Sequence, residues 1–186
     1  MWMARCIYNT IRENVMLIGL SGKMGTGKST LANHIKKLFP KVVTEKVAGD
    51  LYAIQDYIYE RCGLTMQGEK DRPLLIALGQ WGRSISPSLW TDSCFRRVAK
   101  LIAEDPNVVV IIDDIRFPEE AKRVEEMWLL IRIEGVQRGP NVNPELINNL
   151  SEMALDSWNF EHRIDNRGTE EDVLKQLENI LGGKHG

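Results

Sequence analysis

Short apolar runs alternate along the chain with stretches in which apolar residues recur at helical spacing. The short runs predict buried strands at residues 15–20, 42–47, 107–113, 129–133 and 162–164. Recurrence at three or four positions, together with one charged run at 118–127, predicts helices at residues 28–39, 51–62, 71–79, 89–103, 118–127 and 170–181. Because strands and helices alternate, the sequence predicts an α/β fold with a mostly parallel sheet.

A glycine-rich loop lies between the first predicted strand and the first predicted helix. Residues 22–29, GKMGTGKS, match G-x-x-x-x-G-K-[ST] at every fixed position. In such a loop the backbone N–H groups face phosphate oxygens, and the dipole of the following helix adds positive charge. Lys28 is expected to reach the β- and γ-phosphates, and the hydroxyl of Ser29 to ligate Mg²⁺. A dinucleotide fingerprint fits less well, because its third glycine would fall on Thr30.

Two acids and an arginine lie at and just after the end of the run at 107–113. Asp113 and Asp114 point to opposite faces of a strand, so both cannot aim equally at a metal ion. A carboxylate that caps the helix before Pro118 is the competing interpretation. Phosphoryl transfer also needs cations that converge from separate segments. The candidates are Lys23, Arg72, Arg83, Arg116, Arg132 and Arg138.

These segments together resemble the deoxynucleoside monophosphate kinases best known from bacteriophages, a family related to phosphomevalonate kinase. The resemblance rests on LSGKMGTGKS, DRPLLIALGQWGR, VIIDDIRFPEEAKRVE, LSEMALD and RIDNRGTEEDVLKQLENIL, in this order. It implies one kinase domain over residues 1–186, with the three-layer fold of nucleoside monophosphate kinases. It also implies a five-stranded, mostly parallel sheet and a small mobile lid at about 135–150.

The resemblance also implies roles for individual residues. The ATP site would comprise Gly22, Gly25, Thr26, Gly27, Lys28, Ser29, Thr30, Arg138, Asn166 and Gly168. The catalytic residues would be Lys28, Asp114, Arg116 and Lys23, with Ser29 and Asp114 as the ligands of Mg²⁺. The acceptor would meet Arg72, Trp81, Arg83 and Trp90.

Three positions depart from the family pattern. Met24 stands where another basic residue is common, Tyr52 ends a segment that lacks the usual proline and lysine, and Asn149 replaces a frequent histidine. Tyr52, Tyr57, Trp81 and Trp90 fall in the acceptor segments, where they either stack on a base or pack in the core. The acceptor is therefore less well defined by the sequence than the ATP site.

Composition limits the other classes of function. The 186 residues are 43% hydrophobic, with 24 Lys plus Arg against 26 Asp plus Glu, which gives a formal charge of -2. No global basic field attracts DNA, RNA or an acidic membrane. No segment reaches the roughly 20 apolar residues that span a bilayer. Three scattered cysteines favour a reducing, cytoplasmic setting without a disulfide framework.

The leading hypothesis is an ATP- and Mg²⁺-dependent kinase that phosphorylates a deoxynucleoside monophosphate. A kinase of phosphomevalonate or another phosphorylated metabolite is the second hypothesis, and a nucleotide-binding regulatory module without transfer activity is the third. The chain lacks a guanine-reading N-K-x-D motif, which weighs against a switch protein. A small molecule is the expected partner. The sequence is compatible with a monomer or a homodimer, and it assigns no role to residues 1–13.

Overall fold

The computed structural model describes residues 16–68, 70–126, 128–136 and 150–182. The strands are β1 (Met16–Ser21), β2 (Val42–Glu45), β3 (Val109–Ile115), β4 (Leu129–Glu134) and β5 (His162–Asp165). The helices are α2 (Lys28–Leu38), α3 (Gly49–Cys62), α4 (Arg72–Ile85), α5 (Leu89–Glu104), α6 (Pro118–Glu125), α7 (Leu150–Met153) and α8 (Glu170–Gly182).

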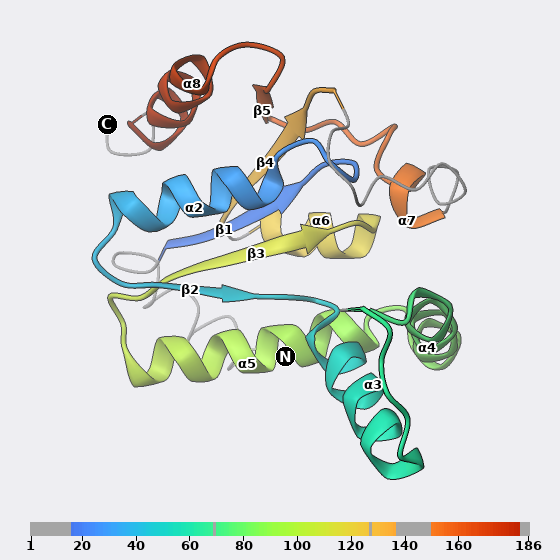
Figure 1. The fold of residues 1–186 in the computed structure, drawn as a ribbon. Helices are drawn as coiled ribbons and strands as arrows, with labels where there is room; N and C mark the ends of the chain where they lie inside the picture. The colour runs from blue at the N-terminus through green and yellow to red at the C-terminus, as the bar shows by residue number, and fades with distance from the viewer. Residues whose placement is uncertain (1–15, 69, 127, 137–149, 183–186) are drawn as a thin grey trace.

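The five strands form one sheet in the order β2-β3-β1-β4-β5, and every neighbouring pair is parallel (Figure 1). The chain passes from β1 to the β2 side of the sheet and later returns to the β4 side. The strand order therefore reverses beside the carboxyl end of β1, which is where open α/β sheets bind their ligands. The glycine-rich loop leaves β1 at this point.

Side chains that alternate along the strands fill two cores, one on each face of the sheet. Leu17, Val110 and Ile112 pack with α5 and α6, whereas Ile18 and Ile111 pack with α2 and α8. Figure 1 shows α2 and α8 on one side of the sheet and α5 on the other. Both faces are covered, which explains why the strands are continuous apolar runs rather than alternating ones. The expected three-layer α/β architecture is confirmed.

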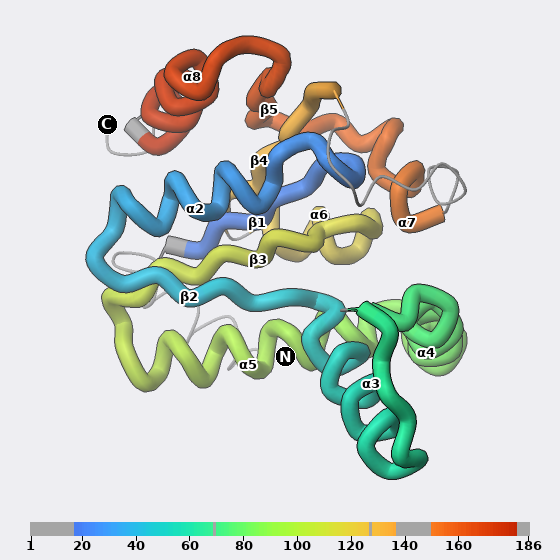
Figure 2. Tube along the Cα trace, viewed as in Figure 1, coloured from blue at the N-terminus to red at the C-terminus, as the bar shows by residue number. Residues whose placement is uncertain are grey.

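Helices α3 and α4 lie side by side beyond the end of β2, away from α2 and α8 (Figure 2). Helix α4 is longer than the predicted 71–79, because its glycines serve packing instead of ending the helix. A Cβ on Gly82 would lie 2.4 Å from the indole ring of Trp90 on α5. The indole Nε1 also donates a 3.2 Å hydrogen bond to the carbonyl of Gly79. This close approach fixes α4 against α5.

Strand β3 continues through both aspartates instead of ending at residue 113. Among the described residues, no helix is long and apolar enough to cross a membrane. Most of the expected lid, including Arg138, lies outside the described residues, as does Asn149.

Candidate active site

The glycine-rich loop joins the buried end of β1 to the first turn of α2. Gly27 has a φ of 102°, and a Cβ at this position would lie 2.3 Å from Nδ2 of Asn166. Only glycine fits both the backbone conformation and the space. The first residues of α2, Lys28 to Thr30, line the cavity described below, and the N-terminus of a helix is suited to binding phosphate, as in a P-loop.

Lys28 is the first residue of α2, and its side chain folds back along the loop. Its Nζ donates hydrogen bonds of 2.6 Å to the carbonyl of Gly22 and 2.8 Å to that of Lys23. Burial, followed by the nearby positive charge of Arg116, lowers the pKa of Lys28 to about 8. Lys28 is therefore a cation at neutral pH that is sensitive to its charged neighbours.

A cavity of about 750 Å³ opens between the P-loop, α3 and α4. Several residues of the predicted site line it together: Gly25, Gly27, Lys28, Ser29, Thr30, Arg72, Arg83, Trp90, Asp114, Arg116 and Asn166. The structure thus brings the glycine-rich loop, the acidic strand end and the arginines of α4 around one space. Such convergence of polar groups is typical of a binding site.

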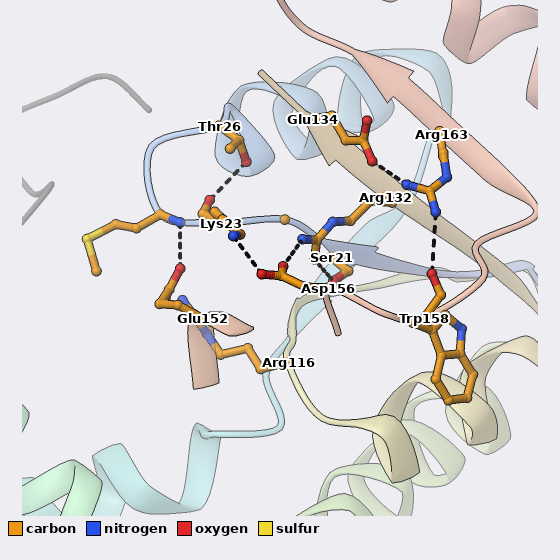
Figure 3. A network of polar contacts seen from close by, with 12 residues as sticks. Ser21, Lys23, Thr26, Arg116, Arg132, Glu134, Glu152, Asp156, Trp158 and Arg163 are labelled. Atoms are coloured by element: carbon orange, nitrogen blue, oxygen red, sulfur yellow. Dashed lines mark hydrogen bonds and ion pairs between the residues drawn. The ribbon is translucent and has the colours of Figure 1, made fainter. Parts of the chain in front are cut away.

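Five predicted residues do not line this cavity: Gly22, Lys23, Thr26, Trp81 and Gly168. Lys23 and Thr26 border a second hollow on the other side of the loop, where Nζ of Lys23 pairs with Asp156 at 2.8 Å (Figure 3). Trp81 is 56% exposed on the outer side of α4. The side chains of Lys23 and Trp81 therefore lie outside the cavity that holds the other predicted catalytic and acceptor residues. Tyr57, 62% exposed, also lies away from the cavity, whereas Tyr52 lines it.

The two aspartates of β3 have different partners. Asp113 accepts a 2.9 Å hydrogen bond from Nζ of Lys46, at the end of β2. Asp114 accepts from the backbone N–H groups of Val47 and Ala48, at 2.8 and 3.0 Å. Burial raises the pKa of Asp114 despite these two N–H donors. Asp114 thus fixes the turn that leads from β2 into α3.

A magnesium ion fits this set of residues. Ser29, Asp113 and Asp114 all line the cavity, although Asp113 already accepts from Lys46 and Asp114 from two backbone N–H groups. Mg²⁺ is commonly held by one or two carboxylates together with substrate phosphates. Within the described ranges, no group of three or more His, Cys, Asp or Glu residues is placed to hold a metal without such phosphates. The negative charge of Asp113 opposes part of the decrease in the pKa of Lys28, so Asp113 lies close enough to interact with the charge of the P-loop lysine.

The wall opposite the P-loop carries cations. Lys70, Arg72 and Arg83 line the cavity, and none of them forms an ion pair with a described residue. The Arg83 guanidinium lies 4.1 Å from the ring centroid of Phe117, and Nζ of Lys70 lies 5.2 Å from that of Tyr52. Cation–π contacts hold these side chains without neutralising their charge. This wall is suited to an anionic acceptor.

Sequence reasoning missed several residues around the cavity. Lys46, Lys70, Phe117 and Glu120 line it, and Glu152 bonds to the P-loop beside it. Lys46 could have been found as a cation near the end of a predicted strand. Glu152 lies in the LSEMALD segment, but that segment gave it no role, because its contact with Met24 spans 128 residues.

A scan against protein-family models finds no match for the chain, and a search of curated proteins also finds none. Solved structures do resemble it. TT1252 from Thermus thermophilus gives a TM-score of 0.59 at 16% identity, covering 94% of this chain and all of that one. A shikimate kinase from Aquifex aeolicus gives 0.50 at 18% identity, covering 91% and 98% of the two chains. The chain therefore shares the fold of these two proteins, and the predicted nucleoside-monophosphate-kinase-like architecture is confirmed.

Proposed function

We propose that the protein is a kinase that transfers the γ-phosphoryl group of Mg²⁺-ATP to a deoxynucleoside monophosphate, giving ADP and a deoxynucleoside diphosphate. One observation carries this proposal: one cavity joins the P-loop, two acids and a wall of cations that form no ion pair within the described part of the chain. The fold shared with a shikimate kinase agrees with phosphoryl transfer to a small molecule. The acceptor class rests on the sequence resemblance and on the cationic wall.

In this reaction an oxygen of the acceptor's phosphate bonds to the γ-phosphorus, while the bond from that phosphorus to the β–γ bridging oxygen breaks. ADP leaves with the electron pair of the broken bond. Lys28 and Arg116 stabilise the charge on the transferred group, and Ser29 with Asp114 and Asp113 would hold Mg²⁺, which supplies further positive charge. The acceptor phosphate is already anionic, so the protein needs no general base.

The acceptor would lie between the P-loop and α4. Arg72 and Arg83 would bind its phosphate, and the open face of Tyr52 would contact its base. Trp90 supports this wall as a packed side chain, because it is only 6% exposed and bonds to Gly79. Asn166 would contribute on the nucleotide side, where it also lines the cavity. Arg138 keeps its proposed role in covering ATP, and the nucleotide-side roles of Gly22, Thr26 and Gly168 rest on the sequence motif.

The cations at both ends of α4 favour a second candidate. Lys70 with Arg72 at one end and Arg83 near the other suit an acceptor with two anionic groups, such as phosphomevalonate with its carboxylate and phosphate. This candidate uses the same P-loop chemistry. It differs from the first only in the acceptor.

The test is to incubate the protein with Mg²⁺-ATP and, separately, each deoxynucleoside monophosphate, each ribonucleoside monophosphate and phosphomevalonate. ADP and the phosphorylated acceptor are both quantified. Product from a deoxynucleoside monophosphate supports the first candidate, and product from phosphomevalonate alone supports the second. Lys28→Ala is the matched negative control. ATP binding without transfer to any acceptor would contradict both candidates and favour a regulatory module.

A further inference from the structure

Glu152 is a buried carboxylate that connects α7 to the P-loop. Its side chain is 4% exposed, and its Oε2 accepts a 2.8 Å hydrogen bond from the backbone N–H of Met24. Its Oε1 accepts from Nη1 of Arg116. Figure 3 shows Glu152 between the loop and the Arg116 side chain. One carboxylate therefore joins the P-loop to the arginine that follows β3.

Arg116 is held at both its main chain and its side chain. Its backbone N–H donates a 2.7 Å hydrogen bond to Glu120, while its Nη1 is bonded to Glu152. Nε and Nη2 have no hydrogen-bond partner in the described part of the chain, and the residue lines the cavity. A guanidinium is planar, so bonding one nitrogen limits the direction of the other two. Those two remain to donate to a phosphate.

The negative charge of Glu152 also offsets a repulsion within the site. Arg116 and Arg132 each lower the pKa of Lys28, whereas Glu152 raises it. Lys28 and Arg116 repel each other in this partly buried environment, and the negative charge of Glu152 acts against that repulsion.

A second carboxylate, four residues later, reaches the same loop. Asp156 pairs with Nζ of Lys23 at 2.8 Å and with Nη2 of Arg132 at 3.3 Å, and Nη1 of Arg132 donates to the hydroxyl of Ser21 (Figure 3). Asp156 is 41% exposed, so its contribution is weaker. The buried Glu152 is the stronger of the two contacts.

We propose that Glu152 is a positioning residue: it aims the guanidinium of Arg116 at the transferred phosphoryl group and fixes the P-loop at Met24. This inference rests on the proposed function. It assigns Glu152 no contact with the reacting atoms, since it acts through Arg116. Misplacement of a catalytic group by about 1 Å can cost roughly 10²-fold in rate.

The test is a double-mutant cycle on the full chain with Glu152→Gln, Arg116→Ala and the combined variant, measuring kcat and KM for ATP and for the acceptor. Glu152→Gln is nearly isosteric and should lower kcat about 10²-fold, with both KM values changed less than about threefold. In the Arg116→Ala background the same substitution should have almost no further effect, because the Gln side chain still accepts from Met24 and Glu152 otherwise acts through that arginine. An unchanged kcat, or effects that simply multiply, would overturn the proposal.

Glu171→Gln is the matched control, because Glu171 lies on the surface of α8 and, among the described residues, pairs only with Lys175, at 2.8 Å. Its kcat should equal that of the unaltered protein. Hydrogen exchange of the Met24 amide gives a readout that needs no turnover: Glu152→Ala should speed exchange, and Glu152→Gln should retain most of the protection. Equal exchange in all proteins would refute the contact. Failure of every acceptor would refute the proposed function alone, so the two failures are distinguishable.

Discussion

The side-chain amide of Asn166 donates a 2.8 Å hydrogen bond to the main-chain carbonyl of Thr26, across 140 positions of sequence. Asn166 follows β5, and its own backbone N–H bonds to the carbonyl of Glu134 at 2.7 Å. The P-loop is therefore held against the end of the sheet by a residue from the C-terminal part of the chain. This contact needs the close approach that Gly27 allows.

Replacement of Gly27 by alanine should damage both folding and nucleotide binding. The added Cβ would meet Nδ2 of Asn166 at 2.3 Å, and the φ of 102° is unfavourable for any L side chain. Gly63→Ala is the control, because Gly63 has a φ of 63° but no atom within 4 Å of the added Cβ. We expect Gly63→Ala to lower the free energy of unfolding by about 1–2 kcal/mol, and Gly27→Ala to lower it further.

Urea denaturation of both variants measures this difference, and titration with ATP measures the effect on binding. Only Gly27→Ala should weaken ATP binding. Equal losses of stability in the two variants would show that the crowding against Asn166 has no energetic consequence.

Nucleotide affinity should fall as the pH rises through about 8. The pKa of Lys28 is lowered to about 8 by burial and by Arg116, and the protonated amine is the form that binds phosphate. Rising pH removes the proton from the free protein first, so the affinity should decline by up to about tenfold per pH unit above 8.

The measurement is an ATP titration at intervals from pH 6.5 to 9.5. Lys28→Arg is the control, because a guanidinium keeps its charge over this range. Its affinity, whatever its absolute value, should be nearly flat between pH 8 and 9.5. An equally steep decline in Lys28→Arg would assign the pH dependence to another group.

The fold was largely predictable because its signals are local. Buried parallel strands are apolar runs, and the P-loop motif lies between a strand and a helix in the sequence as it does in the structure. The end of α4 was not predictable in this way. Gly79 and Gly82 usually indicate a helix end, but here Gly82 provides space for the ring of Trp90 and the carbonyl of Gly79 accepts from its Nε1. Both requirements appear only when α5 packs against α4.

Site residues were predictable where they belong to one short motif and unpredictable where they depend on contacts between distant segments. Ser29 and Arg116 were found from short patterns, and both line the cavity. The contacts of Glu152 with Met24 and Arg116 join residues 128 and 36 positions apart, and no local pattern marks such pairs. For Lys23 the motif fixes the position in the loop, but it does not fix the direction of the side chain, which points toward Asp156.

Glu120 is the buried carboxyl behind Arg116. It is 4% exposed, and its Oε2 accepts from the backbone N–H groups of Arg116 and Phe117 at 2.7 and 3.1 Å. Burial raises the pKa of Glu120 to about 8, more strongly than the two donors lower it. At neutral pH the folded protein therefore keeps a proton on this group that the unfolded chain has already lost.

This difference predicts that the contribution of Glu120 to stability is fully present below about pH 4.5 and is lost as the pH rises to about 8. Over that window the folded state binds one more proton than the unfolded state, so the free energy of unfolding should fall by up to about 1.4 kcal/mol per pH unit from this group. Glu120→Gln imitates the protonated acid and should remove this part of the slope, which urea denaturation at pH 5, 6.5 and 8 will measure.

Glu126→Gln is the control, since Glu126 is an exposed carboxylate that lies 3.9 Å from Lys122, and it should keep the slope of the unaltered protein. An identical slope in Glu120→Gln would mean that Glu120 is ionised in the folded protein at neutral pH.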